Sequence, residues 1–182
     1  YSGEKGTVFS VVRYGNVAGS RGSVIPIWNN IIKNGGTTLG VTDMRMTRFW
    51  ITLEQGVELV WHAFDDMVGG EIYVKKIPSM NICDIAKAVN PGCEQKTIGI
   101  RPGEKLHEQM IGVEDAHYTY EYPDHFKILP QICNWNSFDA MIKGGKQVPE
   151  GFSYTSDNNK EWMTIPELRG WIEENRIKIG SI

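Results

Sequence analysis

Thr7-Val8-Phe9-Ser10-Val11-Val12-Arg13-Tyr14, closed by Gly15-Asn16, is the stretch that decides the fold of this chain. Its valines and aromatic residues are typical of a buried β-strand, and a Gly-Asn pair commonly ends one. Residues 23–34 then read as a helix, with Ser23 as a suitable cap and Gly35-Gly36 as the stop. A strand followed at once by a helix predicts an α/β architecture.

The rest of the chain continues this alternation. Residues 53–67 carry apolar side chains at helical spacing and are followed by Gly69-Gly70, which predicts a helix. The other predicted elements are strands over 38–41, 48–51, 71–75 and 96–100, helices over 81–89 and 165–175, and an amphipathic helix over 106–111. Residues 144–159 read as a loop. We expect the last helix to dock on the core.

Length and composition exclude several classes of function. With 182 residues, the chain has the size of one domain or of one domain with an appendage. A net charge of -3 and scattered basic residues give no electrostatic basis for binding nucleic acid or an anionic membrane. Cys83, Cys93 and Cys133 lack Cys-x-x-Cys spacing, so a reducing cytoplasm is expected.

Neither a membrane span nor a signal peptide is expected from the sequence. No stretch of about 18 apolar residues occurs, and no basic and apolar leader precedes the first strand. Position 1 is not Met, and a strand-like run begins by Thr7. We therefore expect that an N-terminal partner is missing.

Two polar turns are candidate ligand-binding elements. Arg101-Pro102-Gly103-Glu104-Lys105 suits an anionic ligand rich in hydroxyls, because Arg grips phosphate through parallel bonds and Glu accepts from a hydroxyl. Residues 42–50 can present Arg48 to phosphate, and Thr42 or Asp43 to a base or sugar edge. Taken alone, each turn is also compatible with a solvated surface loop.

Common cofactor and catalytic motifs are absent or misplaced. Gly15 to Gly22 follows a strand, but its Gly-x-x-x-Gly-x-x-Gly spacing departs from the dinucleotide fingerprint, and no acidic residue ends a second strand about 20 residues later. Tyr1-x-x-x-Lys5 has no room to form a helical dyad before the strand. His107-Glu108 lacks the second His of a zinc-protease helix, so no metal site is expected.

Five motifs in fixed order nevertheless resemble one enzyme family. They are Val11-Val12-Arg13-Tyr14-Gly15-Asn16-Val17, Gly19-Ser20-Arg21-Gly22-Ser23-Val24-Ile25-Pro26, Thr42-Asp43-x-Arg45-Met46-Thr47-Arg48-Phe49-Trp50, Lys76-Ile77-Pro78-Ser79-Met80 and Ile100-Arg101-Pro102-Gly103-Glu104-Lys105-Leu106-His107-Glu108. With Tyr154-Thr155-Ser156-Asp157-Asn158-Asn159, they are similar to the C-terminal half of the inverting UDP-N-acetylglucosamine 4,6-dehydratases, which are extended short-chain dehydrogenases/reductases.

The resemblance implies an α/β fold made of the end of a Rossmann sheet and a small α/β substrate domain. It places the last part of the Rossmann-type domain in residues 1–36, the nucleotide-sugar domain in 37–130, and a C-terminal extension with a terminal helix in 131–182. It also implies an NADP-dependent conversion of UDP-N-acetylglucosamine to a UDP-4-keto-6-deoxy sugar with inversion at C5, for flagellin or capsule sugars. Members of the family form homo-oligomers, so the resemblance also implies a contact between subunits. The last helix could form this contact instead of docking on the core.

The resemblance places the family's catalytic groups and Gly-rich cofactor loop upstream of Thr7. We therefore expect no catalytic residue in this chain, and NADP bound mainly by an N-terminal half. A noncatalytic nucleotide-sugar-binding module, alone or paired with a separate Rossmann half, is the alternative. The resemblance implies two groups of site residues. Tyr14, Gly15, Asn16 and Val17 would lie near the nicotinamide, and Asn16 would also donate to the substrate. Arg48 and Arg101 would bind the diphosphate, Glu104 would accept from a hydroxyl, and Thr42 and Asp43 would lie near the uracil.

Overall fold

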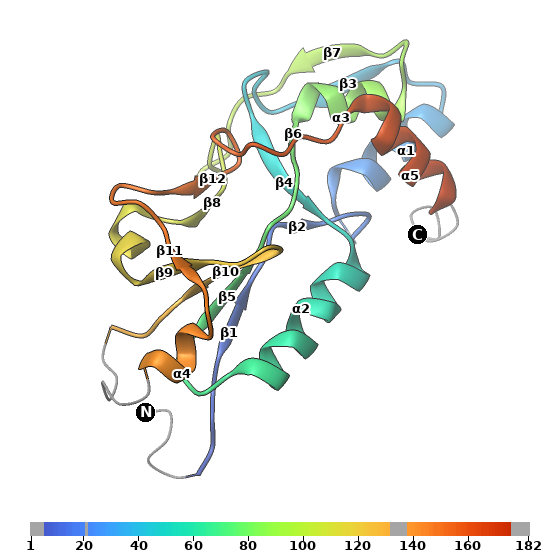
Figure 1. Cartoon of the computed structure of the whole chain (residues 1–182). Coiled ribbons are helices and arrows are strands. Elements are labelled where there is room, and N and C mark those ends of the chain that lie inside the picture. Colours follow the sequence, from blue (N-terminus) through green and yellow to red (C-terminus); the bar gives the residue numbers. More distant parts are fainter. Residues whose placement is uncertain (1–5, 21, 132–137, 176–182) are drawn as a thin grey trace. The chain divides into compact units, whose positions relative to one another are not determined.

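The computed structural model describes residues 6–20, 22–131 and 138–175, and these form two compact units (Figure 1). The first unit contains the described residues of Tyr1–Gly15, Thr52–Ile77 and Gln109–Thr155. The second contains those of Asn16–Ile51, Pro78–Glu108 and Ser156–Ile182. Both units mix helices and strands, so the predicted α/β class is confirmed. The domain boundaries implied by the resemblance stay a prediction.

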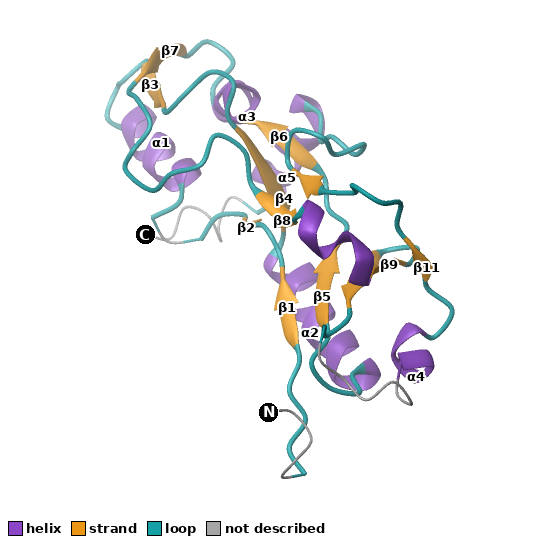
Figure 2. Cartoon of the chain, turned by 90° about the vertical axis from the view of Figure 1, so that its left-hand side faces the viewer, coloured by secondary structure: helices purple, strands orange, loops and turns teal. Residues whose placement is uncertain are grey.

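The first unit is built on a five-stranded sheet with the order β1-β5-β10-β9-β11 (Figure 1). Figure 2 shows β1 beside β5. β1 (Val11–Arg13) and β5 (Ile72–Lys75) are parallel. The next three strands, β10 (His125–Ile128), β9 (Thr119–Glu121) and β11 (Lys146–Gln147), continue the sheet with antiparallel pairing. β1 therefore lies at one edge of this sheet.

The predicted strand over 7–14 is shorter and less buried than expected. Only Val11–Arg13 forms a strand, and Val8, Phe9 and Val11 are 40%, 64% and 54% exposed. Among the residues that the structure describes, β1 has a sheet neighbour on one side only. An edge strand lacks the cross-strand side chains that a second neighbour would place beside its own, so more of its apolar surface stays in solvent.

α2 (Leu53–Asp66) covers this sheet and confirms the predicted helix. It begins with a capping box, in which the Thr52 hydroxyl accepts from the Gln55 N–H and the Gln55 side chain accepts from the Thr52 N–H. Leu59 and Ala63 are buried toward the sheet. Four other apolar residues of the helix form a stripe that faces solvent: Leu53, Val57, Trp61 and Phe64.

The first unit also holds a buried charged group. Lys127 on β10 is 1% exposed, and its Nζ donates to the Asp66 carboxylate and, at 2.8 Å, to the Met141 carbonyl. Lys143 Nζ and Tyr73 Oη also donate to Asp66, at 2.8 and 2.7 Å. Asp66 thus joins α2, β5, β10 and the residue after α4 (Phe138–Ile142) in one hydrogen-bonded group.

The predicted helix over 106–111 is wrong. β8 (Gln109–Ile111) is a strand that pairs antiparallel with β12 (Tyr154–Thr155), and a 3-10 helix, Val113–Tyr118, follows it. The Ser156 N–H donates to the Glu108 carbonyl at 2.8 Å, so pairing with a distant segment begins before the strand does. The apolar spacing of six residues cannot separate a short helix from a buried strand, and the tertiary pairing decides.

Two small sheets form the second unit. β2 (Asn16–Val17) is parallel to β4 (Thr47–Ile51), which is antiparallel to β6 (Ser79–Asn81). β3 (Thr38–Val41) is parallel to β7 (Glu94–Thr97). The strand predicted over 96–100 therefore lies earlier in the chain than expected. Gly99, whose φ is +89°, turns the chain out of the strand direction soon after β7.

Three helices, α1 (Val24–Lys33), α3 (Ile82–Val89) and α5 (Ile165–Glu174), pack around the core of the second unit. All three match predicted helices. Leu168 and Ile172 of α5 are buried in this core, which confirms that the last helix docks. Within the described part of the chain, no helix is both long and apolar enough to cross a bilayer.

Candidate functional site

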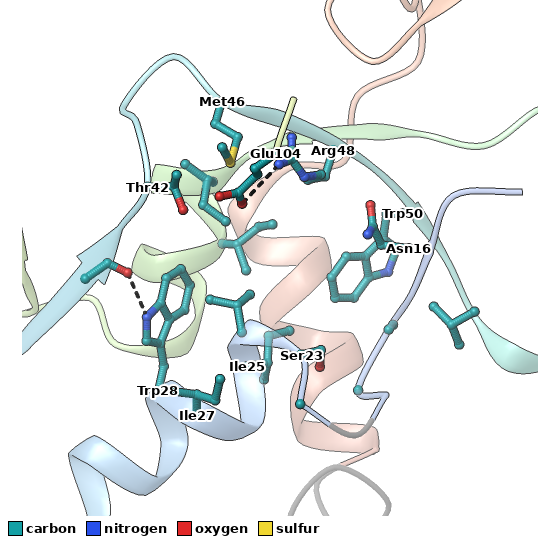
Figure 3. A pocket seen from close by; sticks show the side chains of 18 of the residues that line it. Asn16, Ser23, Ile25, Ile27, Trp28, Thr42, Met46, Arg48, Trp50 and Glu104 are labelled. Carbon is teal, nitrogen blue, oxygen red and sulfur yellow. Dashed lines mark hydrogen bonds and ion pairs between the residues drawn. The ribbon is translucent and has the colours of Figure 1, made fainter. Parts of the chain in front are cut away.

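A cavity of about 390 Å³ lies in the second unit (Figure 3). The loop after β2, α1, β3, β4, α3 and the segment after β7 form its wall. Apolar side chains make up most of the lining, among them Ile25, Trp28, Met46, Trp50, Ile82 and Ile85. The polar lining residues are Asn16, Ser23, Thr42, Arg48, Arg101 and Glu104. Five of these six were predicted as site residues, so the fold brings distant motifs together at one cavity.

Arg48 on β4 is held by its own chain. Its side chain is only 13% exposed, and Nη1 donates to the carbonyls of Thr47 and Leu106 at 2.7 and 3.1 Å. Nη2 lies 3.5 Å from Glu104 Oε1, and Nε lies 3.4 Å from Glu108 Oε1. The guanidinium therefore has two carbonyl acceptors and two neighbouring carboxylates, so its charge is balanced within the chain.

The Arg101 to Glu104 turn fixes the position of the Glu104 carboxylate. The Glu104 N–H donates to the Arg101 carbonyl at 3.0 Å, and Gly103 has a φ of +81°. Pro102 followed by Gly103 is the pair that a type II turn prefers, because the third position needs a positive φ. Glu104 Oε2 accepts from the Arg101 N–H at 3.2 Å, which holds the carboxylate next to Arg48.

Among the described residues that line the cavity, Arg101 is the available cation. Its side chain is exposed and lines the same cavity as Arg48. Its guanidinium makes no ion pair or hydrogen bond with any residue that the structure describes. An unpaired guanidinium offers its whole planar set of donors to an incoming anion. Of the two predicted phosphate-binding arginines, Arg101 is therefore free and Arg48 is engaged.

Thr42 and Asp43 take different positions. Thr42 lines the cavity, whereas Asp43 is not among the lining residues. The Asp43 carboxylate accepts from Arg45 Nε and Nη2 at 3.0 and 2.8 Å, and from the Arg45 N–H at 2.9 Å. These bonds from Arg45 lower the pKa of Asp43 to about 2. Asp43 thus stays ionised and shapes the turn that carries Thr42.

The predicted cofactor residues divide between the two units. Asn16 and Val17 form β2 and line the cavity, whereas Tyr14 and Gly15 belong to the first unit. These four residues offer one phenol and one carboxamide but no cation. They therefore fit the nicotinamide end of a dinucleotide better than its negatively charged phosphates. In the described part of the chain, no group of three or more His, Cys, Asp or Glu side chains could hold a metal ion.

Sequence reasoning missed a polar network behind Arg48. Thr47 Oγ1 lies 2.8 Å from His107 Nδ1 and 2.6 Å from Ser156 Oγ, and Ser156 Oγ accepts from the Glu108 N–H at 2.9 Å. This network anchors the segment that carries Glu108 to the strand that carries Arg48. Thr47 and Ser156 are 109 positions apart, so no local pattern could have linked them.

Several known proteins are similar to this chain. A family model described as "Polysaccharide biosynthesis protein" matches residues 1–130. A UDP-N-acetylglucosamine 4,6-dehydratase (inverting) from Campylobacter jejuni is 51% identical over 92% of this chain and 52% of that protein. A UDP-glucose 4-epimerase from Rickettsia rickettsii is 39% identical over 92% of this chain and 49% of that protein.

A solved structure shares the fold. The X-ray structure of Pen from Bacillus thuringiensis superposes with a TM-score of 0.80 at 31% identity, and the match covers 96% of this chain and 52% of that one. The chain thus spans about half the length of the relatives that it matches. The predicted resemblance to the C5-inverting dehydratases is confirmed by the relative from Campylobacter jejuni.

Proposed function

Because this chain belongs to the polysaccharide biosynthesis protein family, we propose that its cavity binds the nucleotide sugar UDP-N-acetylglucosamine. In this proposal the chain is the substrate-binding part of a C5-inverting, NADP-dependent 4,6-dehydratase. The name of the relative that is 51% identical supports this substrate and reaction. The observation that carries the proposal is the free Arg101 guanidinium beside the Arg48 and Glu104 pair at one cavity.

Arg101 binds the diphosphate in this proposal. A charge-assisted, bidentate contact to phosphate is the strongest interaction that a free guanidinium can make at a partly exposed position. Glu104 and Glu108 would repel the same anion if they stood alone. Arg48 lies within 3.5 Å of both carboxylates and offsets one of the two negative charges, which reduces this repulsion.

The other polar residues contact the uncharged parts of the ligand. Glu104 accepts from a ribose or sugar hydroxyl, and Asn16 donates its carboxamide N–H to the sugar. Thr42 lies near the uracil, and Asp43 acts through the turn that it forms with Arg45. The fully apolar part of the wall excludes water from the sugar and the base.

In this proposal, most of the cofactor site and all of the reacting groups belong to a part of the enzyme outside this chain. Bound NADP supplies reversible hydride transfer, and Tyr14 to Val17 contact its nicotinamide end. The acid and base that act at C5 and C6 come from a part of the enzyme that precedes Thr7 in the relatives. We also propose a cytoplasmic location, supported by the free thiols of Cys83 and Cys93, and a homo-oligomeric full-length enzyme.

Calorimetric titration of the purified chain with UDP and UDP-N-acetylglucosamine tests this function. Binding of both, without turnover when NADP is added, is expected. Arg101→Ala should weaken UDP binding by about 10- to 150-fold, the equivalent of about 1.5–3 kcal/mol for a hydrogen bond to a charged group. Arg169→Ala, a surface change on α5 away from the cavity, should leave binding unchanged.

Two results would contradict the proposal. If Arg101→Ala binds UDP as tightly as the unaltered chain, the phosphate assignment is wrong. If the chain alone converts UDP-N-acetylglucosamine in the presence of NADP, the reacting groups lie within it and the assignment of a substrate-binding role alone is wrong.

A further inference from the structure

Four charged side chains at the cavity carry charges that cancel. Arg48, Arg101 and Glu104 line the cavity, and Figure 3 shows the pair that Arg48 forms with Glu104. Glu108 is not among the lining residues, but its Oε1 lies 3.4 Å from Arg48 Nε. Two guanidinium groups and two carboxylates leave no net charge. An anion can therefore bind to Arg101 directly, but these four groups together give it no net attraction.

The fold keeps Glu108 beside Arg48 through its backbone. The Glu108 N–H donates to Ser156 Oγ at 2.9 Å, and the Ser156 N–H donates to the Glu108 carbonyl at 2.8 Å. Ser156 is completely buried, and its hydroxyl lies 2.6 Å from that of Thr47, the residue before Arg48 in β4. Both backbone polar groups of Glu108 are thus tied to the strand that carries Arg48.

The Arg48 side chain has other contacts that orient it. Nη1 donates to the carbonyls of Thr47 and Leu106, and Nη2 lies 3.5 Å from Glu104 Oε1. Glu108 therefore adds mainly its negative charge to this arrangement. That charge repels any anion in the cavity, and the repulsion grows in proportion to the charge of the anion. The more highly charged of two ligands is thus disfavoured more strongly.

We propose that Glu108 is a specificity-determining residue that selects the nucleotide sugar over the free nucleotide by charge, an inference that rests on the proposed function. The diphosphate of UDP-N-acetylglucosamine is a diester with about two negative charges. Free UDP carries about three at pH 8, because a terminal phosphate loses its last proton near pH 6. Removal of the Glu108 charge should therefore favour UDP more than UDP-N-acetylglucosamine.

Glu108→Gln is the central variant, because it removes the charge and keeps an oxygen that can accept from Arg48 Nε. The Glu108 side chain is 36% exposed, so solvent screens its charge and a change of a few fold is expected. Calorimetry at pH 8 and about 0.1 M salt should show about threefold tighter binding of UDP-N-acetylglucosamine and about fivefold tighter binding of UDP. Glu108→Asp keeps the charge and should leave both affinities close to those of the unaltered chain.

Two controls separate the charge of Glu108 from a structural effect. Glu94→Gln makes the same change at an exposed position of the same unit, where Glu94 Oε2 accepts from Thr38 Oγ1 at 3.1 Å outside the cavity lining, and it should change neither affinity. Salt is the second control. At about 0.5 M salt, screening should reduce both gains of Glu108→Gln to less than about 1.5-fold, whereas a structural effect would persist.

A larger, salt-sensitive gain for UDP than for UDP-N-acetylglucosamine in Glu108→Gln supports the proposal. Equal gains for the two ligands, no gain, or weaker binding overturn it, while binding by the unaltered chain leaves the proposed function standing. Gains that persist at about 0.5 M salt also overturn it, since they would show that the substitution acts through the structure. If the unaltered chain binds neither ligand, the proposed function and this selectivity both fall.

Discussion

Arg48 Nη2 and Glu104 Oε1 lie 3.5 Å apart, although 56 positions separate the two residues in the sequence. The pair joins β4 to the turn that follows β7, and both side chains line the cavity (Figure 3). Arg101, three positions before Glu104, makes no such contact in the described structure. Removal of the Arg48 side chain and removal of the Arg101 side chain are thus expected to have different effects.

Arg48 should matter for stability and Arg101 should not. Arg48→Met removes the donors to two carbonyls and leaves Glu104 and Glu108 without a balancing charge, which should cost about 2–4 kcal/mol in the free energy of unfolding. Arg101→Ala should change it by less than about 0.5 kcal/mol. Urea unfolding followed by circular dichroism measures both. Equal midpoints for the two variants would show that the Arg48 contacts do not stabilise the fold.

Two glycines should respond to alanine in opposite directions. Gly103 has a φ of +81°, so Gly103→Ala strains the turn that holds Glu104 and should cost about 1–2 kcal/mol. Gly170 lies inside α5 with no atom within 4 Å of an added Cβ. Gly170→Ala should stabilise the chain by about 0.5–1 kcal/mol, because alanine favours the helix. Thermal melts of both variants are the measurement. A gain in stability for Gly103→Ala would contradict the assigned turn.

Acid should weaken the first unit through Asp66. Burial raises the pKa of Asp66, but hydrogen bonds from Lys127, Lys143 and Tyr73 outweigh it and hold the pKa well below the ordinary value of 3.8. A carboxyl with a lowered folded-state pKa contributes stability that is complete above its unfolded pKa and is lost as pH falls through the folded value. The midpoint of urea unfolding should therefore fall as pH is lowered from about 5 to 2.

Asp66→Asn provides the comparison for this pH dependence. The variant leaves Lys127 buried without a counter-charge, so it should be about 3–5 kcal/mol less stable at pH 7. Its stability should also vary less with pH between about 5 and 2, since the titrating group is gone. An unaltered slope in Asp66→Asn would assign the acid sensitivity to other carboxyl groups.

The apolar stripe of α2 should make the isolated chain self-associate. Trp61 and Phe64 are 65% and 60% exposed, and their ring centroids lie 6.0 Å apart. A contiguous apolar patch of this kind favours association. Sedimentation velocity should show a concentration-dependent shift that Trp61→Lys with Phe64→Lys removes. Val113→Lys, at a 56% exposed position in the same unit, adds charge elsewhere and should not remove it. A monodisperse unaltered chain would refute this expectation.

Helices were the most predictable part of the fold. Asn81 caps α3 by accepting from the Cys83 N–H at 2.8 Å, and Thr164 and Glu167 form a capping box at α5. These signals are local, so sequence spacing is enough to find them. Strand bounds were less predictable, as residues 106–111 show, because the pairing of β8 with β12 depends on a segment more than forty residues away.

The residues that line the cavity were more predictable from the sequence than the hydrogen bonds that they make. Ordered motifs brought Arg48, Arg101 and Glu104 to one cavity, as expected from the resemblance. The Arg48 guanidinium already donates to the carbonyls of Thr47 and Leu106. The sequence could not predict these hydrogen bonds, because no pattern of side chains encodes the orientation of backbone carbonyls.

The pairing of β2 with β4 places Asn16 opposite Trp50 and Val17 opposite Ile51. One residue added within β4 before Trp50 would turn Trp50 to the opposite face of its strand and end its pairing with Asn16. Closing a longer loop, in contrast, costs little. Over evolutionary time, descendants of this sequence should therefore accept insertions between Val89 and Glu94, the segment that joins α3 to β7, far more readily than a single insertion within β4.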